Sequence, residues 1–131
     1  MVGNSSKQGQ GVGSRVLVVD DDPDILDALS EILEVEGYEV QRARNGREAL
    51  QRLEQALPDL VLLDLMMPVM DGWEFARSLA PGARPPIIVL SADRNVSAKA
   101  KEIGALGWLA KPFELSELLD AVRSVVPVET P

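Results

Sequence analysis

Residues 16–23 read Val-Leu-Val-Val-Asp-Asp-Asp-Pro, a short apolar run that ends in three adjacent carboxylates. A second run of the same design, Leu-Val-Leu-Leu-Asp, follows at residues 60–64. Short continuous apolar runs are typical of buried parallel strands. Because adjacent acids repel one another, acids at the ends of two such strands indicate a shared site for a divalent cation.

Length, composition and charge narrow the class of protein. The chain has 131 residues, of which 46% are hydrophobic, so it is long enough for one domain with a core and too short for two. Its 13 basic and 21 acidic residues give a net charge of −8. This charge opposes binding to nucleic acid backbones and to anionic membrane surfaces, so we expect neither as a direct partner.

The chain contains no cysteine and no histidine. Their absence excludes disulfides, thiolate and imidazole metal sites, cysteine nucleophiles, Ser-His-Asp triads and phosphohistidine carriers. Any chemistry must therefore use carboxylates, hydroxyls and lysines.

The two ends of the chain differ from its middle. Residues 1–13 are mostly Gly, Ser, Asn and Gln, which predicts a disordered tail and not a signal peptide. We expect residues 127–131 to form a C-terminal tail or the start of a linker. The predicted domain therefore covers residues 14–126. No apolar stretch approaches the roughly 20 residues that span a bilayer, so we expect a soluble, cytoplasmic protein.

Between the ends, strand and helix patterns alternate with short connections, which predicts βα units around a parallel sheet. The predicted fold is a single doubly wound, flavodoxin-like α/β sheet with strand order 2-1-3-4-5. We expect five strands, at residues 15–19, 38–43, 59–63, 87–91 and 106–110. We expect five helices: one that ends near Gly37, one over residues 45–55, one that starts at Asp71, one over residues 96–103, and one along the apolar stripe from Leu115 to Val126.

In such sheets, functional groups collect beyond the carboxyl ends of the strands. With the order 2-1-3-4-5, strands one and three are neighbours, which would bring Asp21 beside Asp64. Each polar residue at a strand end also has an ordinary interpretation, as a turn or cap for the acids, a turn hydroxyl for the serine and a surface position for the lysine. These strand-end residues are Asp20, Asp21, Asp64, Ser91 and Lys111.

The third acid of the opening run has a structural explanation. Asp22 precedes Pro23, and proline is favoured at the first position of a helix, so we interpret Asp22 as a helix cap. Asn45 and Glu48 have the spacing of a second cap pair, and Asp71 is expected to cap the third helix.

Taken together, these residues resemble the receiver domain of two-component response regulators, the CheY-like superfamily. The resemblance spans residues 15–126, and its motifs occur in order at the strand ends. They are Val-Val-Asp20-Asp21, Asp64-Leu-Met-Met-Pro68 with Asp71-Gly72, Leu90-Ser91-Ala92, and Lys111-Pro112-Phe113.

The resemblance implies a phosphoacceptor. Asp64 would receive a phosphoryl group from the phosphohistidine of a sensor histidine kinase, from a phosphotransfer protein or from a small phosphodonor, and become 4-aspartylphosphate. Mg²⁺ would be bound by Asp21, Asp64 and the backbone carbonyl of Met66, with Asp20 ordering a bound water. Such a domain is not an enzyme for a separate substrate, because it catalyses only its own phosphorylation and dephosphorylation.

Lys111 and Ser91 would contact the phosphoryl oxygens in the same family. The bond between Lys111 and Pro112 is usually cis there. Met66 and Asp93 occupy two positions that tune the lifetime of the phosphoryl group. Met66 offers no hydrogen bond to an attacking water, whereas Asp93 is able to offer one.

Signalling in the family uses a surface made by the fourth helix, the fifth strand and the fifth helix. This surface contacts a downstream effector and supports homodimers. Ser91 would move toward the phosphoryl group, and an aromatic residue on the fifth strand, commonly Tyr or Phe, often rotates with it. Trp108 holds that position here, and three interpretations stay open: a switch residue, a partly exposed strand aromatic or an anchor for a partner.

Two alternatives belong to other functional classes. A degenerate receiver would bind partners without being phosphorylated, although the complete set of acids, hydroxyl and lysine argues against it. A phosphatase of the haloacid dehalogenase type would use the spacing of Asp20 and Asp22. However, Asp24 stands where that motif expects Thr or Val, and 131 residues leave no room for the additional domain of such an enzyme.

Overall fold

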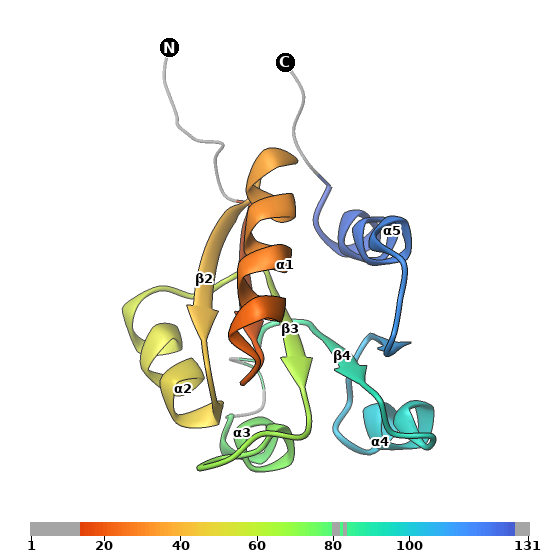
Figure 1. Ribbon diagram of the computed structural model, residues 1–131. Coiled ribbons are helices and arrows are strands. Elements are labelled where there is room, and N and C mark those ends of the chain that lie inside the picture. The colour runs from red at the N-terminus through yellow and green to blue at the C-terminus, as the bar shows by residue number, and fades with distance from the viewer. Residues whose placement is uncertain (1–13, 80–81, 83, 128–131) are drawn as a thin grey trace.

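The computed structural model describes residues 14–79, 82 and 84–127. It contains a five-stranded sheet in which neighbouring strands run parallel, in the order β2-β1-β3-β4-β5 (Figure 1). The predicted fold class and strand order are confirmed. The tail predicted over residues 1–13, and residues 128–131 of the predicted C-terminal tail, lie outside the described residues.

Strands and helices alternate along the whole described chain. The strands are β1 (Arg15–Val19), β2 (Glu39–Ala43), β3 (Leu60–Asp64), β4 (Ile87–Ser91) and β5 (Gly107–Ala110). The helices are α1 (Pro23–Val35), α2 (Gly46–Gln55), α3 (Gly72–Ser78), α4 (Val96–Glu102) and α5 (Leu115–Val125). Within residues 14–79 and 84–127, no helix combines the length and the hydropathy that a bilayer crossing needs.

Three strands start one residue later than predicted. The backbone N–H of Tyr38 donates to the carbonyl of Leu33 and closes the end of α1, so β2 begins only at Glu39. In β3 and β5 the difference is one of definition, because Asp59 and Leu106 already donate to carbonyls of neighbouring strands.

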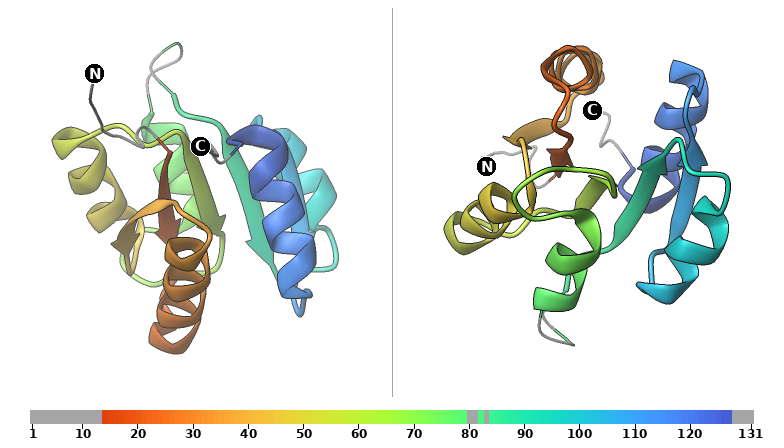
Figure 2. Two further views of the ribbon diagram at one scale, coloured as in Figure 1. Left: turned by 90° about the horizontal axis from the view of Figure 1, so that it is seen from above. Right: turned by 60° about the horizontal axis from the view of Figure 1, so that its bottom comes forward.

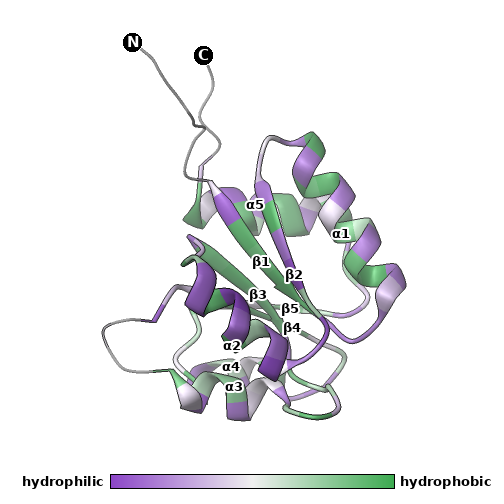
Figure 3. Cartoon of the chain, turned by 90° about the vertical axis from the view of Figure 1, so that its left-hand side faces the viewer, coloured by the Kyte–Doolittle hydropathy of each residue, from purple (hydrophilic) through white to green (hydrophobic). Residues whose placement is uncertain are grey.

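Helices cover both faces of the sheet, α1 and α5 on one face and α2, α3 and α4 on the other (Figure 2). Alternate residues of β1 enter separate cores: Val16 and Val18 pack with Leu118, and Leu17 packs with Phe75. Because both faces of the three central strands are covered, β1, β3 and β4 are apolar along nearly their whole length, whereas the edge strand β2 carries polar residues (Figure 3). Each large side chain buried in this way contributes about 1.5–3 kcal/mol.

The helix starts beside the carboxyl edge of the sheet are capped largely as predicted. The carboxylate of Asp22 accepts from the N–H of Asp24 at 2.9 Å, and the carboxylate of Asp71 caps α3 by accepting from the N–H of Glu74 at 2.9 Å. The cap pair predicted for α2 is only half formed: Asn45 accepts from the N–H of Glu48, but the Glu48 carboxylate accepts from Arg44 instead. These caps fix where each helix leaves the sheet edge that carries the polar residues.

Candidate functional site

The register of the sheet brings the predicted polar residues to one edge. Parallel pairing aligns Val19 with Leu63 across β1 and β3, and Asp64 with Leu90 across β3 and β4. Ser91 aligns with Ala110 across β4 and β5. The residues at or just after these positions therefore surround the same end of the sheet.

Three carboxylates form a compact cluster at this edge. Asp20, Asp21 and Asp64 each offer an oxygen, and these oxygens all lie within 4.8 Å of one another. Asp20 and Asp64 are buried, whereas Asp21 is exposed to solvent. Hard carboxylate oxygens at this spacing, with one side open to water, suit Mg²⁺, which retains several water ligands.

Asp20 is held firmly on its side of the cluster. One carboxylate oxygen accepts from the N–H of Asp22 at 2.9 Å, and the backbone N–H of Asp20 donates to the carbonyl of Ala43 at 3.1 Å. Asp22 itself caps α1 and does not belong to the cluster. The Asp20 and Asp22 spacing that suggested a phosphatase therefore does not produce a pair of facing carboxylates.

Lys111 supplies the positive charge of the site. Its ammonium donates to Asp20 Oδ2 at 2.8 Å and lies 3.7 Å from Asp64 Oδ2. The bond between Lys111 and Pro112 is cis, as the family resemblance implied. Burial of the ammonium lowers its pKa, but the hydrogen bond to Asp20 and the charge of Asp64 outweigh this effect, so the pKa of Lys111 is raised. One lysine thus faces two buried acids and remains charged.

Asp64 carries the strongest electrostatic perturbation at this edge. Burial and the neighbouring charge of Asp20 raise the pKa of Asp64 from 3.8 to about 6, although Lys111 and the N–H of Met66 act in the opposite direction. That N–H donates to Asp64 Oδ1 at 3.1 Å. The cluster therefore has more negative charge than its single lysine neutralises, which favours the binding of a cation.

Ser91 and Asp93 lie on the β4 side of the edge. The Ser91 side chain is fully buried, and its oxygen accepts from the N–H of Asp93 at 3.1 Å. The Asp93 carboxylate accepts from the N–H of Asn95 at 2.7 Å and pairs with Lys99 of α4. Hydrogen bonding to Lys99 lowers the pKa of Asp93.

The two remaining predicted residues are exposed, as Asp21 is. The Met66 side chain is 65% exposed, in the loop after Asp64. Trp108 is 46% exposed and pairs with Val89 in the sheet, on the strand that also precedes Lys111. Neither side chain joins the acidic cluster.

Sequence reasoning missed a close approach of backbone at the start of α3. A Cβ atom on Gly72 would lie 2.8 Å from the carbonyl oxygen of Asp64, so only glycine lets α3 pack directly against this strand end. The signal lay in the motif Asp71-Gly72, in which sequence reasoning gave the glycine no structural role. Val69, in the same loop, has a φ of 70°, a left-handed conformation that is strained for a β-branched residue.

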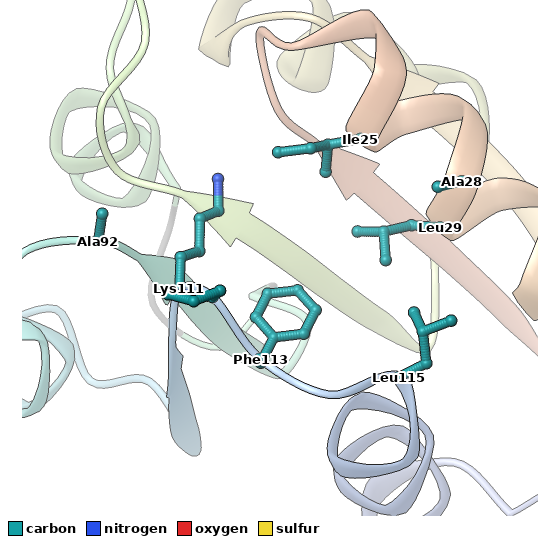
Figure 4. A pocket seen from close by; sticks show the side chains of 8 residues that line it. Ile25, Ala28, Leu29, Ala92, Lys111, Phe113 and Leu115 are labelled. Atoms are coloured by element: carbon teal, nitrogen blue, oxygen red, sulfur yellow. The ribbon is translucent and has the colours of Figure 1, made fainter.

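An apolar cavity of about 410 Å³ adjoins the site between α1 and the segment that follows β5. Figure 4 shows the side chains of Ile25, Leu29 and Phe113 around it. Lys111 also lines this cavity, while its ammonium contacts the acidic cluster. Sequence reasoning did not anticipate this cavity, because its wall combines segments from opposite ends of the chain.

Comparisons with known proteins agree with this geometry. The family described as "Response regulator receiver domain" matches residues 16–123. Response regulator MprA of Mycolicibacterium vanbaalenii is 43% identical over 120 residues, which cover 89% of this chain and 52% of that protein. The chain thus spans about half the length of this relative. Sporulation initiation phosphotransferase F of Bacillus subtilis is 35% identical over 122 residues, with 91% of this chain and 98% of that protein covered.

A solved structure has the same fold. Response regulator protein TrrA of Thermotoga maritima, determined in complex with Mg²⁺ and BeF, superposes with a TM-score of 0.76 at 36% identity. The match covers 86% of this chain and 98% of TrrA. Together with the strand order and the edge that gathers Asp20, Asp21, Asp64 and Lys111, these matches show that the chain belongs to the response regulator receiver domain family, the signalling domain of two-component systems.

Proposed function

We propose that Asp64 is the phosphoacceptor of this receiver domain. The observation that supports this most directly is the position of a buried aspartate with a raised pKa among two further acids and one lysine. A carboxylate is a sufficient nucleophile for phosphorus, and phosphoryl transfer depends mainly on alignment and on neutralisation of charge.

The donor in this proposal is the phosphohistidine of a sensor histidine kinase or of a phosphotransfer protein. A carboxylate oxygen of Asp64 forms the new O–P bond while the N–P bond of the donor breaks. The imidazole nitrogen leaves with the electron pair and is protonated from solvent. Acetyl phosphate would serve as a small donor in the same way. A cytoplasmic location is part of this proposal, because donors made from ATP are present there.

Mg²⁺ fits the residues at this edge. Asp21, Asp64 and the backbone carbonyl of Met66 would bind it, and Asp20 would orient a bound water. When bound, the ion neutralises charge on the phosphoryl oxygens. Asp20 holds Lys111 at 2.8 Å, which keeps the ammonium beside Asp64 and ready to pair with a phosphoryl oxygen.

Ser91 would report the modification to the output surface. Its oxygen already accepts from the N–H of Asp93, so its own proton is free to be donated to a phosphoryl oxygen. The movement would change the surface formed by α4, β5 and α5, which includes Trp108 and contacts an effector or a second copy of the chain. The exposure of Trp108 supports a role as a contact residue on that surface.

The test is phosphorylation by acetyl phosphate in the presence of Mg²⁺, followed by intact-mass measurement. We expect wild type to gain one phosphoryl group and Asp64→Asn to gain none. Asp24→Asn is the matched control, because Asp24 is an exposed acid near the site and outside the cluster, and it should be labelled like wild type. A wild type that stays unmodified under conditions that label other receivers would support a degenerate receiver instead.

A further inference from the structure

Lys99 makes a contact that the proposed reaction does not explain. It lies within α4, and its ammonium reaches back to the carboxylate of Asp93 in the loop between β4 and α4. The two residues are six positions apart, so the ion pair does not have the regular spacing of helix surface pairs. Both side chains are about three-quarters buried, with 27% and 25% exposed, which is unusual for a pair on the surface.

Asp93 connects this pair to the switch hydroxyl. Its backbone N–H donates to Ser91 Oγ at 3.1 Å, and its other carboxylate oxygen accepts from the N–H of Asn95 at 2.7 Å. The side chain of Asp93 is therefore held on the α4 side of the loop by two donors, of which only Lys99 is a charged group.

The position of this carboxylate matters because of the charge nearby. Asp93 follows Ser91 by two residues, and β4 lies beside the strand that carries Asp64. Hydrogen bonding to Lys99 also lowers the pKa of Asp93, so the carboxylate stays ionised. An ionised carboxylate that is free to turn toward the phosphoryl group is able to accept a proton from an attacking water.

We propose that Lys99 is a positioning residue that prolongs the life of the phosphoryl group, because it holds the Asp93 carboxylate on α4 and away from attacking water. This inference rests on the proposed phosphorylation of Asp64. In hydrolysis, a water oxygen forms a bond to phosphorus and the bond from phosphorus to the Asp64 oxygen breaks. The products are the free carboxylate, inorganic phosphate and one proton, which the released Asp93 would accept and pass to solvent.

The experiment measures loss of the phosphoryl group by intact mass after acetyl phosphate is removed. Lys99→Gln should lose it about 2–5-fold faster than wild type, the factor that corresponds to the usual strength of a partly exposed ion pair. Lys99→Arg keeps the charge and should decay like wild type. Arg47→Gln, which removes one positive charge from an exposed position on α2, should also leave the decay unchanged.

A double variant tests whether the effect passes through Asp93. In an Asp93→Asn background, Lys99→Gln should no longer accelerate the decay, because no carboxylate is left to release. A decay in Lys99→Gln that equals wild type, or an acceleration that persists in the Asp93→Asn background, would overturn the inference. A merely structural role would lower the melting temperature of Lys99→Gln without this dependence on Asp93.

The outcomes separate this inference from the proposed function. A wild type that takes up no phosphoryl group would contradict both. A wild type that is labelled, together with a Lys99→Gln variant of unchanged decay, would contradict only the role of Lys99.

Discussion

Polar groups are paired at the amino end of the central sheet, whereas acids are crowded together at its carboxyl end. At the amino end, Arg15 pairs with Glu39 at 3.0 Å, its backbone N–H donates to Asp59 at 2.8 Å, and the buried Tyr38 hydroxyl donates to the carbonyl of Val126 at 2.6 Å. At the carboxyl end, three carboxylates crowd together and one lysine pairs with two of them.

This difference separates stability from function within one sheet. Matched polar groups at the amino end stabilise the folded chain, whereas crowded acids at the carboxyl end oppose folding until a cation or a proton neutralises them. The same substitution should therefore change stability in opposite directions at the two ends.

The largest effect is expected for Asp64→Asn in metal-free protein. The pKa of Asp64 is about 6 in the folded state and 3.8 in the unfolded reference, so the folded state holds the proton more tightly. Stability from this group is present at low pH and is lost as the pH rises through about 6. Asp64→Asn should raise the free energy of unfolding by roughly 2–3 kcal/mol near pH 7.5 and by little near pH 4.

Urea unfolding in EDTA at the two pH values checks this prediction. Asp59→Asn is the matched control at the amino end, where the carboxylate accepts a hydrogen bond and is not crowded by other acids. Asp59→Asn should lower the free energy of unfolding by a small amount. An equal gain in Asp59→Asn would mean that loss of any negative charge stabilises this chain of net charge −8, and that the site is not special.

The second effect concerns Mg²⁺, which should stabilise the folded state by neutralising the crowded acids at the carboxyl end of the sheet. At 100 times its dissociation constant, a ligand that binds only the folded state stabilises it by about 2.7 kcal/mol. We expect this gain in wild type and in Tyr38→Phe, and its loss in Asp21→Asn. Thermal unfolding with and without MgCl₂ measures it, and a full Mg²⁺ effect in Asp21→Asn would argue against the proposed ligand set.

The third effect tests the amino end. Tyr38→Phe keeps the buried ring but removes the hydroxyl, which leaves the carbonyl of Val126 without this donor. The expected loss is about 1–2 kcal/mol, because a buried acceptor is left unsatisfied. Urea unfolding should show the same loss with and without Mg²⁺. A loss that depends on Mg²⁺ would show that the two ends are coupled.

The smallest effect concerns the backbone at the carboxyl end. Val69 is held at a φ of 70°, where asparagine is tolerated and a β-branched residue is strained. Val69→Asn should therefore raise the free energy of unfolding by about 1 kcal/mol. The control is Val35→Asn, at a valine in α1 that is 77% exposed against 68% for Val69, and it should give no gain in the same urea titration.

Much of the fold was predictable because local patterns carry it. Continuous apolar strands require cover on both faces, and Asp22, Asn45 and Asp71 mark helix starts by their own hydrogen bonds. The half-formed cap pair at Asn45 shows the limit of this reasoning, because the Glu48 carboxylate accepts from the backbone N–H of Arg44 and forms an ion pair with its side chain.

The sequence by itself determined the residue types at the strand ends and, through the parallel alternation, that they share one edge. Only the tertiary structure decided how they pair. Lys111 and Asp20 are 91 positions apart, and the choice of Asp20 over Asp64 as the closer partner depends on strand order and on burial. Charge interactions fall with distance and grow as water is excluded, and neither quantity exists until the chain has folded.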